Sequence, residues 1–389
     1  MKKLLSVFLM FMTFAVAVCG VKLVRYKTLA DIGLDTKSES AYLMDYHSGE
    51  PIYSKNETER LPIASMCKIM TLTLAFEEIE NGNLSLNDTI TVSANAAGMG
   101  GSQIFLDANK NYQVSELIKG IVVASANDAS VAIAEQISGS EEAFVSKMNE
   151  KCTLLGMKDT HFSNCTGLPK AEQYSCAKDV AIMFSALAGH KDYFKFSRIW
   201  MDEIKHDGGR VTEISNTNKL IRFYEGCDGG KTGYTSEAGH CLAATAVRKN
   251  IRLISVVIKA PDSKTRFADV SSMFNYGFAN YENKLIVDNE TPLDIQAEVA
   301  GGKCETVKGI AEEPYYQFCK KNEKIALNID FIPVQRMKAP VEKGEKIGVL
   351  NIYKDNVLIK EINVLAFETV EKQTYFDVIR NIIGEWGLF

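Results

Sequence analysis

Ser65-Met66-Cys67-Lys68 is the stretch that decides the fold expected for this chain of 389 residues. Leu61-Pro62-Ile63-Ala64 leads into it, and apolar residues on helical spacings follow until Asn81-Gly82, so the sequence predicts a helix beginning near the serine. Residues three apart on a helix share one face, which lets Lys68 reach the Ser65 hydroxyl and take its proton. A serine hydroxyl is a poor nucleophile until a neighbouring base activates it. The quartet therefore predicts a nucleophilic serine with a lysine base.

Two further triplets follow in settings that suit a catalytic site. Ser125-Ala126-Asn127 lies between the apolar stretches 117–124 and 129–133, as a short loop between two helices would. Lys231-Thr232-Gly233 follows two glycines and precedes the apolar run 241–247, which predicts a strand and its returning partner. The three motifs together predict one site built from a helix, a loop and a strand.

The residue types in these triplets suit acyl transfer. Ser125 can relay a proton toward a leaving amine, and Asn127 can hold both Lys68 and a substrate amide. The hydroxyl of Thr232 and the charge of Lys231 suit a substrate carboxylate. We therefore expect Ser65, Lys68, Ser125 and Asn127 to be catalytic, and Lys231 and Thr232 to bind substrate.

A lysine must lose its proton before it can act as a base. Its unperturbed pKa is about 10.4, and burial together with a second nearby cation lowers that value. Lys231 is the cation that we expect to act on Lys68. The backbone amides of Ser65 and of the residue after Lys231-Thr232-Gly233 can form an oxyanion hole.

The segment Ser93-Ala94-Asn95 repeats the pattern of the second motif. It comes only 28 residues after Ser65, in a Gly- and Ala-rich stretch without flanking apolar helices. We therefore expect Ser93 to have no part in catalysis.

With these motifs, residues from about 30 to 280 resemble the low-molecular-mass D-alanyl-D-alanine carboxypeptidases, a branch of the penicillin-binding proteins. Further matching stretches are His161-Phe162-Ser163-Asn164 with Gly167-Leu168, Tyr174 to Asp179, Asn216 to Leu220, and Gly230 to Thr235 with Ala238-Gly239. The resemblance implies an α/β penicillin-binding/β-lactamase-like transpeptidase fold, in which helices flank an antiparallel sheet. It also implies a small all-β domain after the catalytic domain and a C-terminal amphipathic helix.

The resemblance assigns further binding residues and shows two departures. Arg266 lies where the family's arginine for the substrate's terminal carboxylate is expected, and Gly233 belongs to the substrate-binding strand. Cys67 replaces a more usual threonine, and Tyr234 stands where a histidine is often found. Tyr234 keeps its backbone amide for the oxyanion hole, so only a side-chain contact to substrate is in question.

Three functions compete on these residues. The first is a serine-type carboxypeptidase that removes the terminal D-alanine from peptidoglycan stem peptides through an acyl-enzyme on Ser65, with β-lactam antibiotics as acylating inhibitors. The second is a β-lactamase, but the Glu-x-x-Leu-Asn setting of class A enzymes is missing between Asn127 and Lys231. The third is a catalytically silent cell-wall-binding protein, against which the intact motif residues argue. Endopeptidase and transpeptidase activities are not separated from the first function by sequence.

Composition excludes some classes of protein. The net charge of −5, without a basic stripe, argues against a nucleic-acid binder. The five histidines and nine cysteines have no metal-site spacing, so neither a metal nor another cofactor is expected. Most of the cysteines are expected to be free and buried, and Cys304 with Cys319 is the one pair that merits a test as a disulfide.

Both ends of the chain carry localisation signals. Lys2-Lys3 precedes the apolar run 4–18, which predicts a signal peptide over residues 1–19 and an exported protein. Cys19 leaves a lipoprotein possible, although Val18 fits that processing poorly. Residues 30–282 are expected to form the catalytic domain. Residues 284–372 consist of short runs in which apolar and polar residues alternate, and they are expected to form the small all-β domain. Residues 374–389 segregate apolar and polar side chains on a helix, which predicts an anchor on the outer face of the cytoplasmic membrane.

Overall fold

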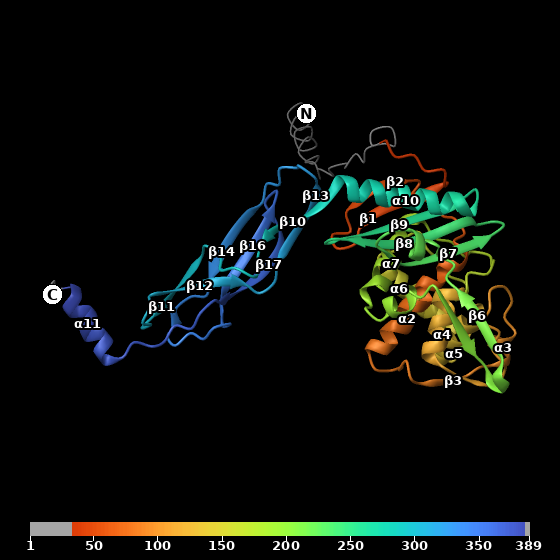
Figure 1. The fold of residues 1–389 in the computed structure, drawn as a ribbon, viewed down its shortest axis with the longest axis horizontal. Coiled ribbons are helices and arrows are strands. Elements are labelled where there is room, and N and C mark those ends of the chain that lie inside the picture. Colours follow the sequence, from red (N-terminus) through yellow and green to blue (C-terminus); the bar gives the residue numbers. More distant parts are fainter. Residues whose placement is uncertain (1–32, 386–389) are drawn as a thin grey trace, which may run out of the picture.

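The computed structural model describes residues 33–385, with side chains described as far as Arg380. A sandwich of helices and strands is followed by a narrow all-β region, and a C-terminal helix lies at the far end from the sandwich (Figure 1). The predicted signal peptide, Cys19 and the last four residues lie outside the described part.

The sandwich is built on one antiparallel sheet whose strands are far apart in the sequence. The first two strands form a hairpin, and one of them pairs with the last strand of this region. The order across the sheet is β2 (Pro51–Lys55), β1 (Ser40–Asp45), β9 (Ile251–Ala260), β8 (Gly239–Arg248) and β7 (Cys227–Thr235). β7 is an edge strand, so one row of its backbone groups is free of strand partners in this sheet.

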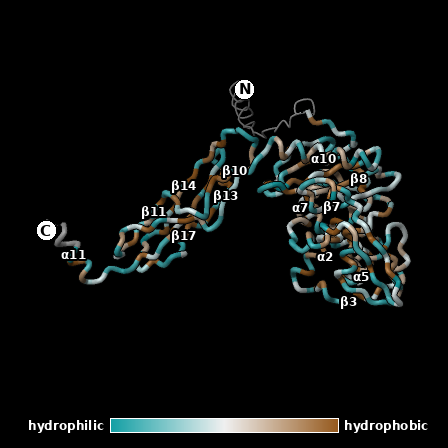
Figure 2. Tube along the Cα trace, in the orientation of Figure 1, coloured by the Kyte–Doolittle hydropathy of each residue, from teal (hydrophilic) through white to brown (hydrophobic). Residues whose placement is uncertain are grey.

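Helices cover both faces of this sheet. The central strands β8 and β9 read as nearly continuous apolar runs because their alternate residues are buried on opposite faces. Leu242 and Leu253 pack under the long helix α10 (Ser263–Asn280), while Ala243 and Ile254 pack against the larger helical layer. Apolar segments accordingly lie inside the sandwich in Figure 2. The fold expected from the motifs is confirmed.

The larger helical layer follows the first hairpin. Its helices are α2 (Lys68–Glu80), α3 (Ala94–Ala97), α4 (Val114–Lys119), α5 (Asn127–Ser138), α6 (Glu141–Leu154), α7 (Ala177–Gly189) and α8 (Tyr193–Ser197). The short helix α9 (Leu220–Phe223) packs in the core on the α10 side of the sheet. Two small strand pairs interrupt the helices: β3 (Thr89–Thr91) with β4 (Asn111–Gln113), and β5 (Met201–Lys205) with β6 (Val211–Ser215).

The all-β region begins without a linker. The segment 281–288, where the sequence suggested a division, is itself strand β10 (Tyr281–Val287), which starts directly after α10 and pairs with β13 (Tyr315–Lys320). A six-stranded sheet follows: β14 (Asn328–Pro333), β16 (Lys346–Lys354), β17 (Val357–Ala366), β12 (Thr306–Ala311), β11 (Gln296–Ala300) and β15 (Met337–Lys338). The expected short runs 357–359 and 362–364 are both parts of β17.

The C-terminal helix α11 (Tyr375–Glu385) follows this region. Reciprocal hydrogen bonds between Thr374 and Asp377 cap its first turn. None of the helices between residues 33 and 385 is long and apolar enough to cross a membrane.

The eight described cysteines are all free. The candidate disulfide is therefore not formed: Cys304 is exposed beside the turn between β11 and β12, whereas Cys319 is buried on β13. Burial raises the pKa of the Cys67 thiol to about 12, so its thiolate is strongly disfavoured beside Ser65.

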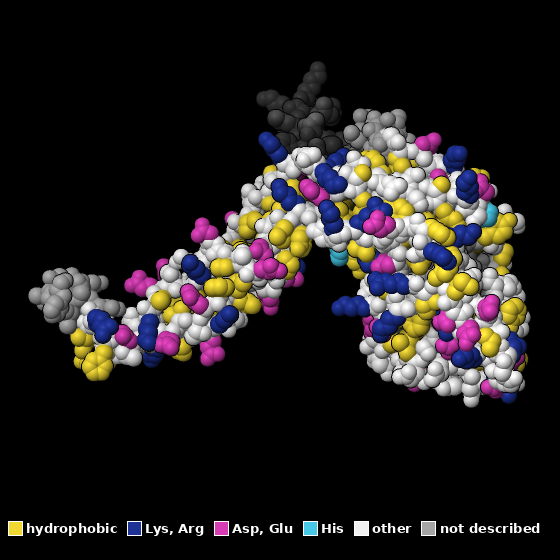
Figure 3. Space-filling view, in the orientation of Figure 1, with side chains coloured by type: hydrophobic (Ala, Val, Ile, Leu, Met, Phe, Trp, Pro, Cys, Tyr) yellow, Lys and Arg dark blue, Asp and Glu magenta, His cyan; other side chains and the backbone are white. Residues whose placement is uncertain are grey.

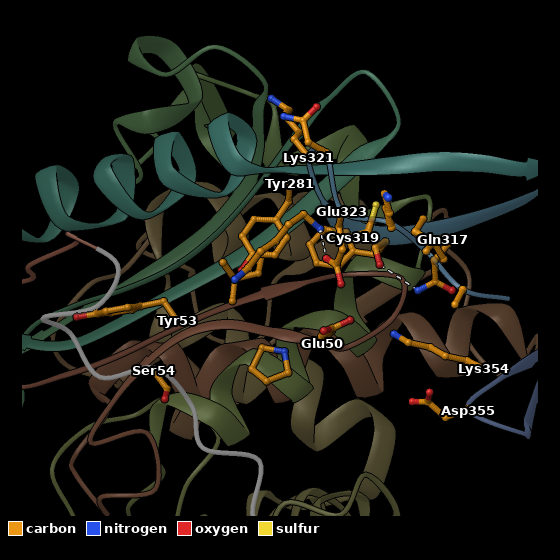
Figure 4. A pocket seen from close by; sticks show the side chains of 18 residues that line it. Glu50, Tyr53, Ser54, Tyr281, Gln317, Cys319, Lys321, Glu323, Lys354 and Asp355 are labelled. Carbon is orange, nitrogen blue, oxygen red and sulfur yellow. Dashed lines mark hydrogen bonds between the residues drawn. The ribbon is translucent and has the colours of Figure 1, made fainter.

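A cavity of about 910 Å³ lies where the sandwich meets the all-β region. Glu50, Tyr281, Gln317 and Lys354 surround it (Figure 4). None of the predicted site residues lines it. The face of the molecule in Figure 3 carries basic and acidic side chains interspersed.

Candidate active site

Ser65 and Lys68 are brought together by a turn tighter than the expected α-helix. Ala64–Cys67 form a 3-10 turn that leads directly into α2 at Lys68. A 3-10 turn has three residues per turn, so side chains three apart are eclipsed. The Lys68 Nζ lies 3.1 Å from the Ser65 Oγ. The Lys68 side chain is buried, so this contact is sheltered from water.

The carbonyl of Thr166 is the second partner of the Lys68 ammonium nitrogen. Sequence analysis missed this contact because a backbone carbonyl has no side-chain signature. Asn164 holds the carbonyl in place: its Oδ1 accepts the backbone amides of Thr166 at 3.1 Å and Gly167 at 2.7 Å. The stretch from Asn164 to Gly167, quoted for its resemblance, therefore fixes the lysine.

Gly167 is required by a close approach of two backbones. Its φ is +84°, and an added Cβ would lie 2.0 Å from the carbonyl oxygen of Ala64. Ala64 precedes the candidate nucleophile and has a positive φ of 47°. Side chains with a Cβ rarely occupy this region, and such strain collects at functional sites.

Ser125 and Lys231 form a second serine–lysine pair facing the first motif. Ser125 has a left-handed backbone, with φ 63°, at the end of the π-helical turn Gly120–Ala124. The Lys231 Nζ donates to the Ser125 Oγ at 2.7 Å and to the carbonyl of Thr232 at 2.9 Å. Thr217, which the motifs did not include as a site residue, binds the Thr232 hydroxyl at 2.8 Å.

Asn127 does not bind Lys68, although this was one of the two contacts expected for its side chain. Its Nδ2 instead donates to the carbonyl of Gly100 at 2.6 Å. Its Oδ1 is buried without a hydrogen-bond partner. A buried amide oxygen left unpaired costs free energy, so it is suited to accept a hydrogen bond from a bound molecule.

The pKa of Lys68 is lowered to about 8, and burial is the cause. The expectation that the charge of Lys231 is responsible is not supported, since burial alone lowers the pKa of Lys68. The repulsion between the two lysines instead lowers the pKa of Lys231, whose pKa is pushed well below its usual range by burial first, then by Lys68 and Arg266. Two like charges cannot both be held at low cost here, and the lowered pKa of Lys231 reflects this repulsion.

Strand β7 packs its backbone against the turn that carries Ser65. An added Cβ at Gly233 would lie 2.6 Å from the carbonyl oxygen of Ile63 and 3.3 Å from the Ser65 amide nitrogen. Glycine is thus needed where the third motif meets the first. The Tyr234 ring points outward, 61% exposed, and stacks on His240 with centroids 4.4 Å apart.

Arg266 lies on the first turn of α10, directly behind β7. Its Nη1 donates to the carbonyls of Gly233 at 3.1 Å and Cys241 at 3.4 Å, and its Nε is buried without a partner. The structure thus joins Ser65 to Lys68, Ser125 to Lys231, and Arg266 to Gly233. The Asn127 side chain contacts the loop at Gly100, and the Tyr234 ring points outward.

The duplicate motif at Ser93 is structural. The Ser93 Oγ accepts the amide of Ala96 at 2.9 Å and caps α3, while Asn95 binds Glu135 at 2.8 Å. The expectation that Ser93 lies outside the site agrees with these contacts.

Replacing Gly167 by alanine tests the close approach of the two backbones. We expect Gly167→Ala to lower the free energy of unfolding by roughly 3 kcal/mol or more. An alanine with a left-handed backbone costs about 1–2 kcal/mol, and its Cβ would overlap a carbonyl oxygen. Gly156→Ala is the matched control, since Gly156 also has a positive φ, 72°, but nothing within 4 Å of its added Cβ. The measurement is denaturant unfolding, and equal losses in the two variants would contradict the packing argument.

Comparison with known proteins matches both regions of the chain. Residues 27–262 match the family model described as D-alanyl-D-alanine carboxypeptidase, and residues 281–372 match the model of the penicillin-binding protein 5 C-terminal domain. The D-alanyl-D-alanine carboxypeptidase DacF of Bacillus subtilis is 39% identical over 394 residues, covering 100% of both chains. DacC of Escherichia coli is 30% identical, covering 86% of this chain and 84% of the relative.

Solved structures agree with the sequence comparison. A peptidoglycan synthesis regulatory factor (PBP3) from Streptococcus pneumoniae superposes with a TM-score of 0.74 at 27% identity, covering 87% of this chain and 100% of that one. Penicillin binding protein 5 from Haemophilus influenzae gives a TM-score of 0.66 at 29% identity, covering 87% and 98%. With the two family models covering most of its length, the chain belongs to the D-alanyl-D-alanine carboxypeptidase family.

Proposed function

We propose that this serine-type D-alanyl-D-alanine carboxypeptidase acts through an acyl-enzyme on Ser65, removing the terminal D-alanine from peptidoglycan stem peptides. The observation that carries the assignment is the Lys68 Nζ, 3.1 Å from the Ser65 Oγ and held by the Thr166 carbonyl. A lysine with a pKa of about 8 is partly neutral near neutral pH, so it can accept the serine proton.

Acylation begins when the Ser65 Oγ attacks the carbonyl carbon of the penultimate D-alanine. The Oγ–C bond forms, the serine proton passes to the Lys68 Nζ, and the carbonyl oxygen gains negative charge. The Ser65 and Tyr234 backbone amides are the proposed oxyanion hole, supported by the contact of Gly233 with the Ser65 backbone.

The peptide bond then breaks and terminal D-alanine leaves. Its nitrogen takes up the proton that Lys68 accepted, relayed through the Ser125 hydroxyl, which Lys231 holds at 2.7 Å. Water then attacks the carbonyl carbon of the remaining ester and gives a proton to the neutral Lys68 Nζ. The Oγ–C bond breaks, Ser65 takes that proton back, and the shortened peptide leaves with a new carboxylate. The unpaired Asn127 Oδ1 is suited to accept the amide of the bound peptide during both steps.

The terminal carboxylate of the substrate is assigned to Thr232, Lys231 and Arg266. Arg266 lies behind β7 with a buried, unpaired Nε, so it supplies positive charge close to this strand. An arriving carboxylate favours the charged form of a lysine, so substrate binding is expected to return a proton to Lys231. The role of Tyr234 is restricted to its backbone, because its ring faces outward onto His240.

Penicillin provides a direct test of the nucleophile. A β-lactam that mimics the D-alanyl-D-alanine end should add one drug mass per chain, observable by mass spectrometry of the intact protein. Ser65→Ala should abolish the adduct, because no other hydroxyl among the described residues forms a hydrogen bond with Lys68. Ser93→Ala, which removes only a helix cap, should keep it. An adduct that survives in Ser65→Ala would contradict the assignment.

The pH dependence of acylation tests the base. Because burial lowers the pKa of Lys68 to about 8, its neutral form increases as pH rises through that value. The rate of penicillin acylation should therefore climb about tenfold per pH unit below 8 and level off above it. Lys68→Arg should lose the reaction, since arginine stays charged. A flat profile between pH 6 and 9 would point to another base.

We also propose that the protein is exported by a signal peptide over residues 1–19 and is held on the outer face of the cytoplasmic membrane by α11. In the described part of this helix, Tyr375 and Phe376 are 76% and 79% exposed, so the all-β region does not cover them. Exposed aromatic side chains on a capped amphipathic helix suit the membrane interface. On the polar side of the helix, the negative charge of Asp377 offsets the positive charge of Arg380. Burial of apolar side chains must therefore supply most of the attraction to the membrane.

Removing the helix tests the anchor. Deletion of residues 374–389 should release an enzyme that still binds penicillin from the membrane fraction, whereas high salt should not, because apolar contact dominates. Arg380→Gln is the matched control on the polar side and should keep the attachment. Sedimentation with membranes measures both. A truncated protein that remains attached after signal cleavage, or that unfolds, would contradict the proposal.

A further inference from the structure

A second cavity, of about 480 Å³, is lined by residues that directly precede Ser65 in the chain. We call it the third-residue pocket. It is bounded by residues 62–64, which directly precede the nucleophile, by the loop 167–174, and by Thr235 and Glu237 just beyond strand β7. The same loop supplies the Gly167 contact to Ala64, so the walls of the pocket are continuous with the site.

The direction of β7 relates this pocket to the substrate. A peptide lying along a free strand edge advances by about 3.3 Å per residue. With its carboxylate at Thr232 and its scissile bond at Ser65, its third residue from the end comes to lie about 7 Å further along. That distance corresponds to two residues of the strand beyond Thr232, at Tyr234, and the next residue, Thr235, lines the pocket. In a stem peptide this third residue is a diamino acid, whose side chain carries an amine.

The polar groups around the pocket favour a cation. Glu172 and Glu237 line it with exposed carboxylates, and no hydrogen bond or ion pair to the described residues occupies either. Of the neighbouring cations, Arg60 pairs with Asp159 at 3.0 Å. Lys170 also lines the pocket, where its ammonium group donates to the carbonyl of Ser163 at 2.9 Å, so two carboxylates face one lysine there.

The acidic wall is also held in a fixed shape. Gln173 uses its Oε1 to accept the amides of Ser163 and Asn164, at 3.0 and 2.9 Å. Glu172, beside it, has a left-handed backbone with φ 62°, a conformation that few residues adopt without local constraint. The loop that carries the Glu172 carboxylate is therefore held in one conformation.

We propose that the third-residue pocket binds the free side-chain amine of the residue third from the end of the stem peptide, through Glu172 and Glu237. The inference rests on the proposed function of Ser65 and extends it to substrate choice. A side-chain amine that is already cross-linked is an amide without charge, so it loses this attraction. The enzyme therefore prefers stem peptides whose third residue is not cross-linked.

Two synthetic pentapeptides test this preference. Both end in L-Lys-D-Ala-D-Ala, and they differ only in whether the lysine amine is free or acetylated. Release of D-alanine gives kcat/KM for each. Exposed ion pairs contribute up to about 1 kcal/mol each, so we expect the free amine to be favoured about fivefold in the unaltered protein. The preference should shrink as salt is added.

Variants that remove the two negative charges test whether Glu172 and Glu237 cause the preference for the free amine. Glu172→Gln with Glu237→Gln should bring the ratio of the two kcat/KM values close to one. The matched control, Glu298→Gln with Glu305→Gln, removes the same charge from exposed positions in the all-β region and should keep the ratio. Penicillin adduct formation on both double variants checks that each is folded.

The outcomes separate this inference from the proposed function. Equal turnover of the two peptides by the unaltered protein, or a preference that persists in Glu172→Gln with Glu237→Gln, overturns the pocket assignment while D-alanine release still supports the carboxypeptidase. Absence of D-alanine release from both peptides, with no penicillin adduct on Ser65, overturns the function on which the pocket rests.

Discussion

Two lysine side chains, Lys68 and Lys231, are buried in one site, and the surrounding structure has to accommodate their charge. Moving a single ammonium group out of water costs several kcal/mol even after relaxation, and a second one nearby adds repulsion. The site lowers this cost by letting the lysines lose protons, and by offering each a serine hydroxyl and a backbone carbonyl. Burial itself lowers the pKa of both lysines, to about 8 for Lys68 and well below its usual range for Lys231.

The carbonyls and hydroxyls must be held at the lysines by backbone that is locally strained. Ala64 and Ser125 have left-handed backbones with φ of 47° and 63°, and Gly167 occupies the same region. Each non-glycine residue of this kind costs about 1–3 kcal/mol and persists only when its surroundings fix it. Here the surroundings are the two apolar cores on either side of the sheet and the buried Asp128, which accepts the amides of Ile104 and Leu106.

The sequence was sufficient for the parts of the site that have side-chain signatures. The spacing of Ser65 and Lys68 and the order of the three motifs led to the correct fold, and the lack of apolar flanks marked Ser93 as structural. The Thr166 carbonyl could not be predicted because any residue supplies one. The pKa of Lys68 is lowered by burial, and the spacing of residues in the sequence does not reveal how deeply a side chain is buried. Strand β10 was missed as a strand because it continues directly from α10, without a turn signal between them.

On the proposed mechanism, the buried lysines couple substrate binding to chemistry. Before substrate arrives, burial together with the charges of Lys68 and Arg266 lowers the pKa of Lys231 well below its usual range. A carboxylate bound beside Thr232 favours the charged form of Lys231. A proton on Lys231 then opposes a proton on Lys68, the amine beside Ser65, when the scissile bond is in place. A peptide without the terminal carboxylate would lose this effect as well as an anchor, so carboxylate recognition and activation of the serine depend on the same pair of buried lysines.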